Sequence, residues 1–212
     1  MSLLWWFLVP ASYLLGAVPW GLLVGKALKR VDVREYGSGR IGMSNVLRTV
    51  GVRGAILVVA GDVGKGVLPI VVTRLLTKEA PSLEAAVALA VLVGHNWSVF
   101  IRFHGGRGIL TGLGTLLPLV PWAGAAAAVV GPIVIALTRY VSLGSLVGMA
   151  TAVAVAIVLA SLGQIPVAYL VYTVAGGGMI LFQHRDNVVG LVLGTERRLG
   201  QRAETRLPAA GS

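Results

Sequence analysis

Three polar stretches of this 212-residue chain hold most of the residues that could carry out chemistry. They cover residues 37–53, 94–108 and 184–196, and each combines glycine with arginine, histidine, serine or asparagine. Glycines let backbone N–H groups approach an anion, and a guanidinium can bind two phosphate oxygens at once. The chain has no Cys, which excludes thiolate nucleophiles and cysteine-ligated metals. The sequence therefore predicts anion-binding chemistry by oxygen and nitrogen groups.

The first stretch reads Gly37-Ser38-Gly39 and continues to Asn45 and Arg48. A glycine-rich turn that leads into hydroxyl, amide and guanidinium groups is typical of phosphate binding. It is not the phosphate loop of nucleotide hydrolases, because Met43 stands where that loop needs Lys. A plain hairpin with packing glycines and lipid-facing cations fits the same spacing equally well.

In the second stretch, Gly105-Gly106-Arg107-Gly108 precedes an expected helix. The N–H groups of that helix, its dipole and Arg107 would converge on a second anion site. The alternative is a tight turn whose arginines bind lipid headgroups. His95 lies deeper in an apolar segment, where a histidine commonly hydrogen-bonds a neighbouring helix.

The third stretch begins with His184 and Asn187, whose spacing places them on one helical face. A charged cap at the end of a membrane span is the alternative for this stretch. Asp62 and Lys65 have the same spacing within an apolar segment, so we expect an ion pair there, with Asp62 orienting a histidine.

The elements that must position these residues are long and apolar. The chain is 56% hydrophobic and only 12% charged, although its formal charge is +10. Residues 1–25, 108–138 and 141–183 contain no charged side chain. Because about 20 apolar residues cross a membrane as a helix, the chain is an integral membrane protein and not a soluble nucleic-acid binder.

Prolines and glycines divide the two longest uncharged runs. Pro118 and Pro121 break the first, and Gly163 and Pro166 break the second. We therefore expect an all-α, polytopic bundle of about seven transmembrane helices in a single membrane-embedded domain over residues 1–212. The fourth helix, residues 108–119, is unusually short. The other expected spans are residues 1–25, 54–76 and 82–101, the fuller part of 108–138 after the proline break, and two runs of about 20 residues within 141–183. A five-span alternative treats 108–138 as one element and the pair after 141 as another, with the same orientation.

The basic residues sort onto one side of this arrangement. Fifteen of the 18 Lys and Arg fall in segments 26–53, 102–107, 139 and 184–212. Cytoplasmic loops carry the excess of positive charge, so we expect the N-terminus outside and the C-terminus in the cytoplasm. The three polar stretches then lie at the same membrane face and can form one site.

Five motifs, taken in order along the chain, resemble the bacterial acyl-phosphate:glycerol-3-phosphate acyltransferase family. Any one of them is weak evidence, but five in the right order and on one membrane side are specific. They are the glycine-rich loop from Gly37 to Gly51, the D-x-x-K-G at Asp62 to Gly66, the segment Gly94 to Gly108, the S-x-x-S at Ser142 and Ser145, and the segment His184 to Glu196.

The resemblance implies a multi-pass enzyme of the bacterial cytoplasmic membrane whose active site faces the cytoplasm. It implies acyl phosphate as donor and glycerol 3-phosphate as acceptor, with lysophosphatidic acid and inorganic phosphate as products. Membrane lipids are the expected surroundings, and no metal, other cofactor or nucleic-acid partner is implied. The implied catalytic residues are Ser38, Arg48, Arg107, His184 and Asn187, and the implied substrate-binding residues are Gly37, Gly39, Asn45, Lys65, His95, Gly105, Gly106, Ser142, Ser145 and Glu196.

Three positions depart from the family pattern: Arg107 stands for a usual Lys, Ser44 for a usual Thr, and Gly190 for a common Arg. We expect the acyl chain to lie among the spans, in a groove made by Gly112, Gly114 and Gly144. The proton of the attacking hydroxyl goes either to His184 or to a substrate phosphate oxygen.

Two other functions suit parts of the pattern. Broken helices and cationic loops also occur in transporters or channels for anionic metabolites, and a degenerate family member would bind phosphates without turnover. The His-x-x-x-x-Asp pair of other glycerolipid acyltransferases is absent, because Phe100, Ile109 and Val189 occupy that position after the three histidines. The oligomeric state stays open.

Overall fold

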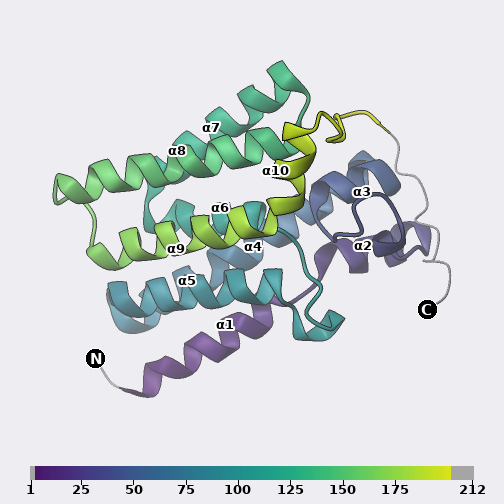
Figure 1. Cartoon of the computed structure of the whole chain (residues 1–212). Helices are drawn as coiled ribbons and strands as arrows, with labels where there is room; N and C mark the ends of the chain where they lie inside the picture. The colour runs from purple at the N-terminus through teal and green to yellow at the C-terminus, as the bar shows by residue number, and fades with distance from the viewer. Residues whose placement is uncertain (1–2, 202–212) are drawn as a thin grey trace.

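The structure, a computed structural model, describes residues 3–201 as a bundle of helices (Figure 1). The all-α prediction is confirmed for these residues, and the two ends of the predicted domain, residues 1–2 and 202–212, lie outside them. The α-helices are α1 (Leu8–Gly16), α2 (Trp20–Lys29), α3 (Met43–Thr49), α4 (Val52–Thr77), α5 (Pro81–Asn96), α6 (Ile109–Leu119), α7 (Pro121–Thr138), α8 (Val141–Ser161), α9 (Val167–Gln183) and α10 (Arg185–Val192), with 3-10 helices η1 (Leu3–Phe7), η2 (Val33–Glu35) and η3 (Val99–Ile101).

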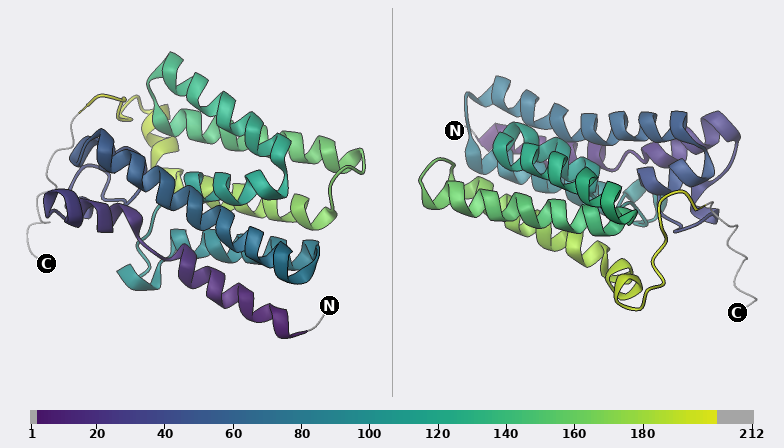
Figure 2. Two further views of the ribbon diagram at one scale, coloured as in Figure 1. Left: turned by 180° about the vertical axis from the view of Figure 1, so that it is seen from behind. Right: turned by 90° about the horizontal axis from the view of Figure 1, so that it is seen from above.

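The bundle has two distinct ends. The polar end carries residues 26–53, 97–108 and 184–201, and the far end carries the turns that follow α4 and α8 (Figures 1 and 2). The two ends of the longer helices therefore differ in chemistry.

The described residues contain five helices long and apolar enough to cross a membrane. A sixth candidate is the pair formed by α9 and α10, which is bent by 59°. The sequence predicted about seven spans, and the difference arises at the short fourth one, α6, and at α9, which qualifies only together with α10. Helix α6 has 11 residues, so it extends about 16 Å and covers roughly half of the hydrocarbon layer. The candidate spans are Trp5–Lys29, Val52–Thr77, Pro81–Ile101, Pro121–Thr138 and Val141–Ser161.

The first span is broken between α1 and α2, immediately before Pro19. A break in a membrane helix leaves backbone carbonyls that need donors from elsewhere. The Ser98 hydroxyl donates to the carbonyl of Ala17 at 2.5 Å, and the Lys65 ammonium donates to that of Val18 at 2.9 Å. These two polar side chains within apolar segments therefore have a structural role.

The predicted ion pair between Asp62 and Lys65 is confirmed, with Lys65 Nζ 2.9 Å from Asp62 Oδ1. Both side chains are almost completely buried. The same Asp62 oxygen lies 3.6 Å from Nδ1 of His95, which is beyond hydrogen-bond distance, so the expectation that Asp62 orients a histidine stays a prediction. Through Lys65, the ion pair links α4 to the break in the first span.

Glycines allow two helix pairs to approach closely. A Cβ added at Gly66 of α4 would lie 2.6 Å from the Thr111 carbonyl oxygen of α6. On the other side of the bundle, a Cβ at Gly144 of α8 would lie 2.6 Å from the carbonyl oxygen of Gly131 on α7. Backbone therefore contacts backbone at both interfaces.

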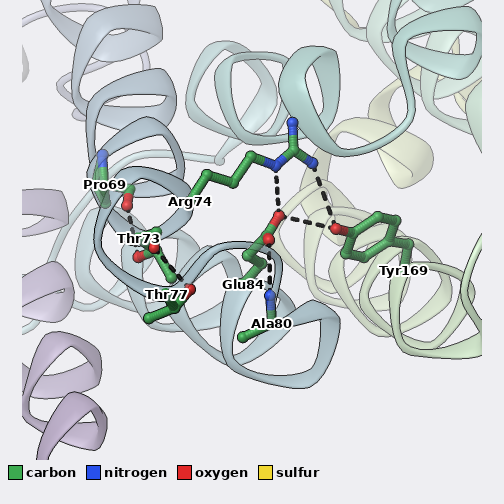
Figure 3. A network of polar contacts seen from close by, with 7 residues as sticks. All are labelled: Pro69, Thr73, Arg74, Thr77, Ala80, Glu84 and Tyr169. Atoms are coloured by element: carbon green, nitrogen blue, oxygen red, sulfur yellow. Dashed lines mark hydrogen bonds and ion pairs between the residues drawn. The ribbon is translucent and has the colours of Figure 1, made fainter. Parts of the chain in front are cut away.

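A buried polar network joins three helices at the far end (Figure 3). Glu84, at the start of α5, accepts hydrogen bonds from Arg74 Nε at 2.7 Å and from the Tyr169 hydroxyl at 2.8 Å. Arg74 also donates to the Tyr169 oxygen at 3.3 Å, and the Ala80 amide donates to Glu84 at 3.3 Å. The network fixes the start of α9 against α4 and α5.

The close α4–α6 contact makes a prediction about stability. Gly66→Ala should lower the free energy of unfolding by about 1 to 3 kcal/mol, because the added methyl group forces apart two backbones. Gly64→Ala, on the same helix, meets no atom within 4 Å and should leave the thermal unfolding midpoint of the purified protein unchanged or slightly raised. Equal midpoints for the two variants would contradict this view of the interface.

Candidate active site

A cavity of about 330 Å³ extends from the polar end into the bundle between α6, α7, α8 and α9. The three polar stretches meet there, as the sequence analysis predicted. Its inner part is apolar, with lining residues such as Leu116, Ile135, Val153 and Ile180. The polar residues that line it are Ser38, Arg40, Ser44, Asn45, Arg48, Asp62, His95, Arg107, Ser142, Ser145, His184, Asn187, Glu196 and Arg197, with Tyr172 and Thr173 at the inner end.

Asn45 shapes the loop of the first stretch. Its amide nitrogen donates to the carbonyls of Val33 at 2.7 Å and Arg40 at 2.9 Å, and its amide oxygen accepts from the N–H of Ser38 at 3.2 Å. Gly37 and Gly39 have φ values of 54° and 69°, a region that glycine adopts without strain. Asn45 and Ser38 line the cavity, whereas Gly37 and Gly39 shape the loop behind it.

Arg48 projects from α3 to the cavity wall. Within residues 3–201, its Nε atom is buried and has no hydrogen-bond partner, while Nη2 lies 3.4 Å from the carbonyl oxygen of Arg198. Burial, followed by the charge of Arg197, lowers the pKa of Arg48, and Glu196 opposes this effect. A buried cationic donor without a full set of partners is suited to an anion.

Arg107 reaches the cavity from the loop before α6. Its Nε is also buried and has no partner among the described residues. Burial, assisted by the charge of Arg40 and opposed by Glu196, lowers the pKa of Arg107 to about 10. Arg107 therefore remains protonated at neutral pH, and its charge faces a partly desolvated space.

Gly105 and Gly106 differ from the expectation that their N–H groups bind an anion. Both N–H groups donate to carbonyls at the end of α5, from Gly105 to Asn96 at 3.2 Å and from Gly106 to His95 at 3.0 Å. A side chain at Gly106 would collide with the His95 ring. Neither glycine lines the cavity, and both hold the loop against α5 so that Arg107 is positioned beside it.

The third stretch folds back onto α8 through Glu196. One Glu196 carboxylate oxygen accepts from the hydroxyl of Ser142 at 2.7 Å and from the amide nitrogen of Asn187 at 2.8 Å. The N–H groups of Thr195 and Glu196 both donate to the carbonyl of Gly190, so a tight turn returns the chain. A Cβ at Gly190 would lie 3.0 Å from the other Glu196 carboxylate oxygen.

His184 lies at the bend between α9 and α10 and is almost completely buried. Its Nδ1 is 2.9 Å from the carbonyl oxygen of Ile180, which assigns the Nδ1–H donor to that bond when the ring is neutral. Nε2 then carries the lone pair. His184 can accept a hydrogen bond from a molecule in the cavity, but burial, assisted by the charge of Arg107, lowers its pKa to about 4, so it is a weak base.

The chain matches a protein-family model described as glycerol-3-phosphate acyltransferase over residues 6–194. The chain belongs to the glycerol-3-phosphate acyltransferase family.

Named relatives of this family member cover almost the whole chain. A glycerol-3-phosphate acyltransferase of Rubrobacter xylanophilus is 46% identical over 196 residues, which are 92% of this chain and 96% of the relative. One of Halalkalibacterium halodurans is 41% identical over 201 residues, covering 94% and 98%.

Two solved structures of the integral membrane glycerol 3-phosphate acyltransferase PlsY (YgiH) are also similar. The glycerol 3-phosphate form has a TM-score of 0.83 at 34% identity, and the lysophosphatidic acid form has a TM-score of 0.81 at 33% identity. Each match covers 92% of this chain and 94% of the solved one. The PlsY-like fold of an integral membrane protein is thereby shown.

Two residues expected in the site or groove of this acyltransferase-family member lie elsewhere. Lys65 is held by Asp62 and Val18 and does not line the cavity. Gly114 packs against the backbone of Val63 on α4, so the expectation that it shapes the groove is corrected, whereas Gly112 and Gly144 do line the cavity.

Sequence reasoning missed the lining role of Asp62, although its spacing to Lys65 was visible. It also missed the inner wall, where Tyr172 and Thr173 of α9 meet the cavity. The signal available in the sequence was that Tyr172 and Thr173 are polar residues within the uncharged run 141–183. Among residues 3–201, no group of three or more His, Cys, Asp or Glu side chains could hold a metal ion.

Proposed function

We propose that this protein transfers a fatty acyl group from acyl phosphate to the sn-1 hydroxyl of glycerol 3-phosphate in phospholipid synthesis. The products are lysophosphatidic acid and inorganic phosphate. The observation that carries the proposal is a single cavity with cationic donors at its polar end and an apolar interior between four helices. Such a cavity suits phosphorylated groups and one hydrocarbon chain at the same time.

The acceptor is supported by the relatives. The matched curated proteins are named glycerol-3-phosphate acyltransferases, and the similar PlsY structures are described in glycerol 3-phosphate and lysophosphatidic acid forms. The chain shares their fold at 33% to 34% identity across 92% of its length.

Acyl phosphate is supported as the donor by the chemistry of the site. It is a mixed anhydride with a good leaving group, so positioning and charge stabilisation suffice without a covalent nucleophile. The chain has no Cys. In the part of the chain that the structure describes, the Ser142 hydroxyl donates to the Glu196 carboxylate and not to a histidine, so Ser142 lacks the histidine base of a Ser-His nucleophile.

Of the arginines that line the cavity, Arg48 and Arg107 each have a buried Nε without a hydrogen-bond partner in the described residues, and the reaction involves two phosphates. In the proposed mechanism Arg48 and the loop of Ser38 hold one phosphate, while Arg107 holds the other. Asn187, Ser142 and Glu196 form a hydrogen-bonded wall beside them. The sn-1 hydroxyl attacks the acyl carbonyl carbon, the carbonyl–phosphate oxygen bond breaks, and inorganic phosphate leaves. The hydroxyl proton passes to His184 Nε2 or to a phosphate oxygen of the substrate.

The orientation follows from charge. The polar end would face the cytoplasm of a bacterial cell across the cytoplasmic membrane, with the N-terminus outside and the C-terminus inside. Thirteen of the described Lys and Arg residues fall in segments 26–53, 102–107, 139 and 184–201, and the far end has only Arg74 and Lys78 among the described residues, so the excess of positive charge supports this orientation. In a seven-span count, α6 would be the short fourth element.

A transporter for an anionic metabolite is less well supported. The cavity ends inside the bundle at Leu116, Ala152 and Tyr172, and its lining residues do not reach the far end. A catalytically degenerate member would bind the same phosphates without turnover. The unpartnered Nε atoms of Arg48 and Arg107 suit either binding or catalysis, so turnover must decide.

An activity assay separates these functions. Purified protein with palmitoyl phosphate and glycerol 3-phosphate should release lysophosphatidic acid and inorganic phosphate in equal amounts. Acyl-CoA in place of palmitoyl phosphate should give no product. Binding of glycerol 3-phosphate without product would indicate the degenerate function, and product from acyl-CoA would refute the proposed donor.

The two arginines should contribute differently from a surface arginine. Arg48→Ala and Arg107→Ala should each cost about 2 to 4 kcal/mol of transition-state stabilisation, measured from kcat/KM. Arg53→Ala, an exposed cation outside the cavity, is the matched control and should retain activity. Arg107→Lys should also retain activity at neutral pH.

In Arg107→Lys, the alkaline limb of the pH profile of activity should nevertheless move to lower pH. Lys has a lower ordinary pKa than Arg, and burial at position 107 lowers the pKa of a cation there. The positive charge is then lost earlier as the pH rises. An unchanged alkaline limb would show that the positive charge at position 107 is not needed for activity.

Orientation can be measured by thiol labelling, since the natural chain contains no Cys. In intact cells, a membrane-impermeant maleimide should label Glu79→Cys and Gln164→Cys, which are exposed at the far end. Arg102→Cys and Arg185→Cys, exposed at the polar end, should be labelled only after lysis. The reverse pattern would contradict a cytoplasmic site.

A further inference from the structure

The apolar part of the cavity has a closed inner end. Leu116 of α6, Ala127 of α7, Ala152 of α8 and Tyr172 of α9 line it there. Beyond them the helices pack into a core cluster whose buried members include Leu119, Val120, Ala123, Ala156 and Tyr169. An occupant that enters from the polar end therefore meets packed side chains at this level.

Tyr172 is the largest side chain at this closed end, and its hydroxyl is hydrogen-bonded. It contacts the hydroxyl of Thr115 on α6. Thr115 in turn donates to the carbonyl oxygen of Gly112 at 2.9 Å, so Thr115 accepts from Tyr172. Because the Tyr172 hydroxyl is buried, displacing the ring would leave a polar group without a partner. The ring is thus fixed across the end of the cavity.

Tyr169, one turn before Tyr172 on α9 and nearer the far end, is fixed as well. It belongs to the buried far-end network with Glu84 and Arg74 (Figure 3). Two successive turns of α9 are therefore attached to α6, α5 and α4 by polar side chains. The helix cannot easily slide to enlarge the cavity.

The depth of the cavity corresponds to a particular chain length. His184 stands twelve residues after Tyr172 on α9, which at about 1.5 Å per residue is roughly 18 Å. Val153 lies eleven residues beyond Ser142 on α8, which gives a similar depth of roughly 16 Å. With C–C bonds of about 1.5 Å, an extended chain advances about 1.3 Å per carbon, so roughly 13 to 14 carbons fill this length.

We propose that Tyr172, held by its hydrogen bond to Thr115, sets the maximum length of the acyl chain that this protein accepts. The inference rests on the proposed acyltransferase function. The carbonyl group lies at the polar end near His184, and the terminal methyl group lies against the ring of Tyr172. Longer chains must bend within the cavity or leave carbons outside it.

The test is a rate profile over decanoyl, myristoyl, palmitoyl, stearoyl and icosanoyl phosphate with glycerol 3-phosphate as acceptor. Because roughly 13 to 14 carbons fill the cavity, the wild-type rate should begin to fall between myristoyl and palmitoyl phosphate. Tyr172→Leu shortens the obstructing side chain and should raise the ratio of stearoyl to myristoyl rates by at least about tenfold, a typical effect of one methylene in an apolar pocket.

Two further variants separate the ring from its hydrogen bond. Thr115→Val keeps the shape at α6 but removes the acceptor, so it should broaden the profile toward long chains by a smaller factor. Ala127→Leu narrows the same end from α7 and should shift the profile toward shorter chains. This variant keeps the proposal falsifiable if Tyr172→Leu fails to fold.

Val171→Ala is the matched control, because Val171 neighbours Tyr172 on α9, is 57% exposed and does not line the cavity. It should keep the wild-type profile. Unchanged profiles in active Tyr172→Leu and Ala127→Leu variants would overturn the proposal while leaving the acyltransferase function intact. A wild-type protein that uses no acyl phosphate of any length would instead refute the function itself.

Discussion

The ion pair between Asp62 and Lys65 is the constraint on which the rest of the polar end depends. A charged pair within an apolar bundle is stabilising only when its remaining hydrogen-bonding capacity is used. Here Lys65 also satisfies the Val18 carbonyl at the break in the first span, while Asp62 lies 3.6 Å from Nδ1 of His95, beyond hydrogen-bond distance. The backbone of His95 accepts from Gly106, next to Arg107. The buried carboxylate thus lies near the histidine whose backbone holds the loop of Arg107.

The sequence predicted the helices, and the meeting of the three polar stretches at one cavity, more successfully than the local role of each residue. Uncharged runs and their prolines predicted the helices, because hydrocarbon imposes a length and backbone satisfaction imposes a helix. Helix α6 shows where this reasoning stops. The prolines predicted where this short apolar helix ends, but its close contact with α4 is visible only in the structure.

Glycines show the same limit within the site. Gly105 and Gly106 form a pattern that suits an anion, yet their N–H groups are used by the last carbonyls of α5. Glycine spacing alone does not distinguish a backbone that approaches a ligand from one that approaches another helix. The contact of Glu196 with Ser142 was equally invisible, since it depends on the turn at Gly190 and joins residues far apart in the chain.

Glycine also determines the character of the cavity wall formed by α7 and α8. Gly131, Gly144 and Gly148 all line the cavity, and the first two bring the helices into backbone contact. Main chain has no rotamers, so this part of the wall cannot yield by turning a side chain aside. At these glycines the wall can therefore change its shape only if α7 and α8 move relative to each other.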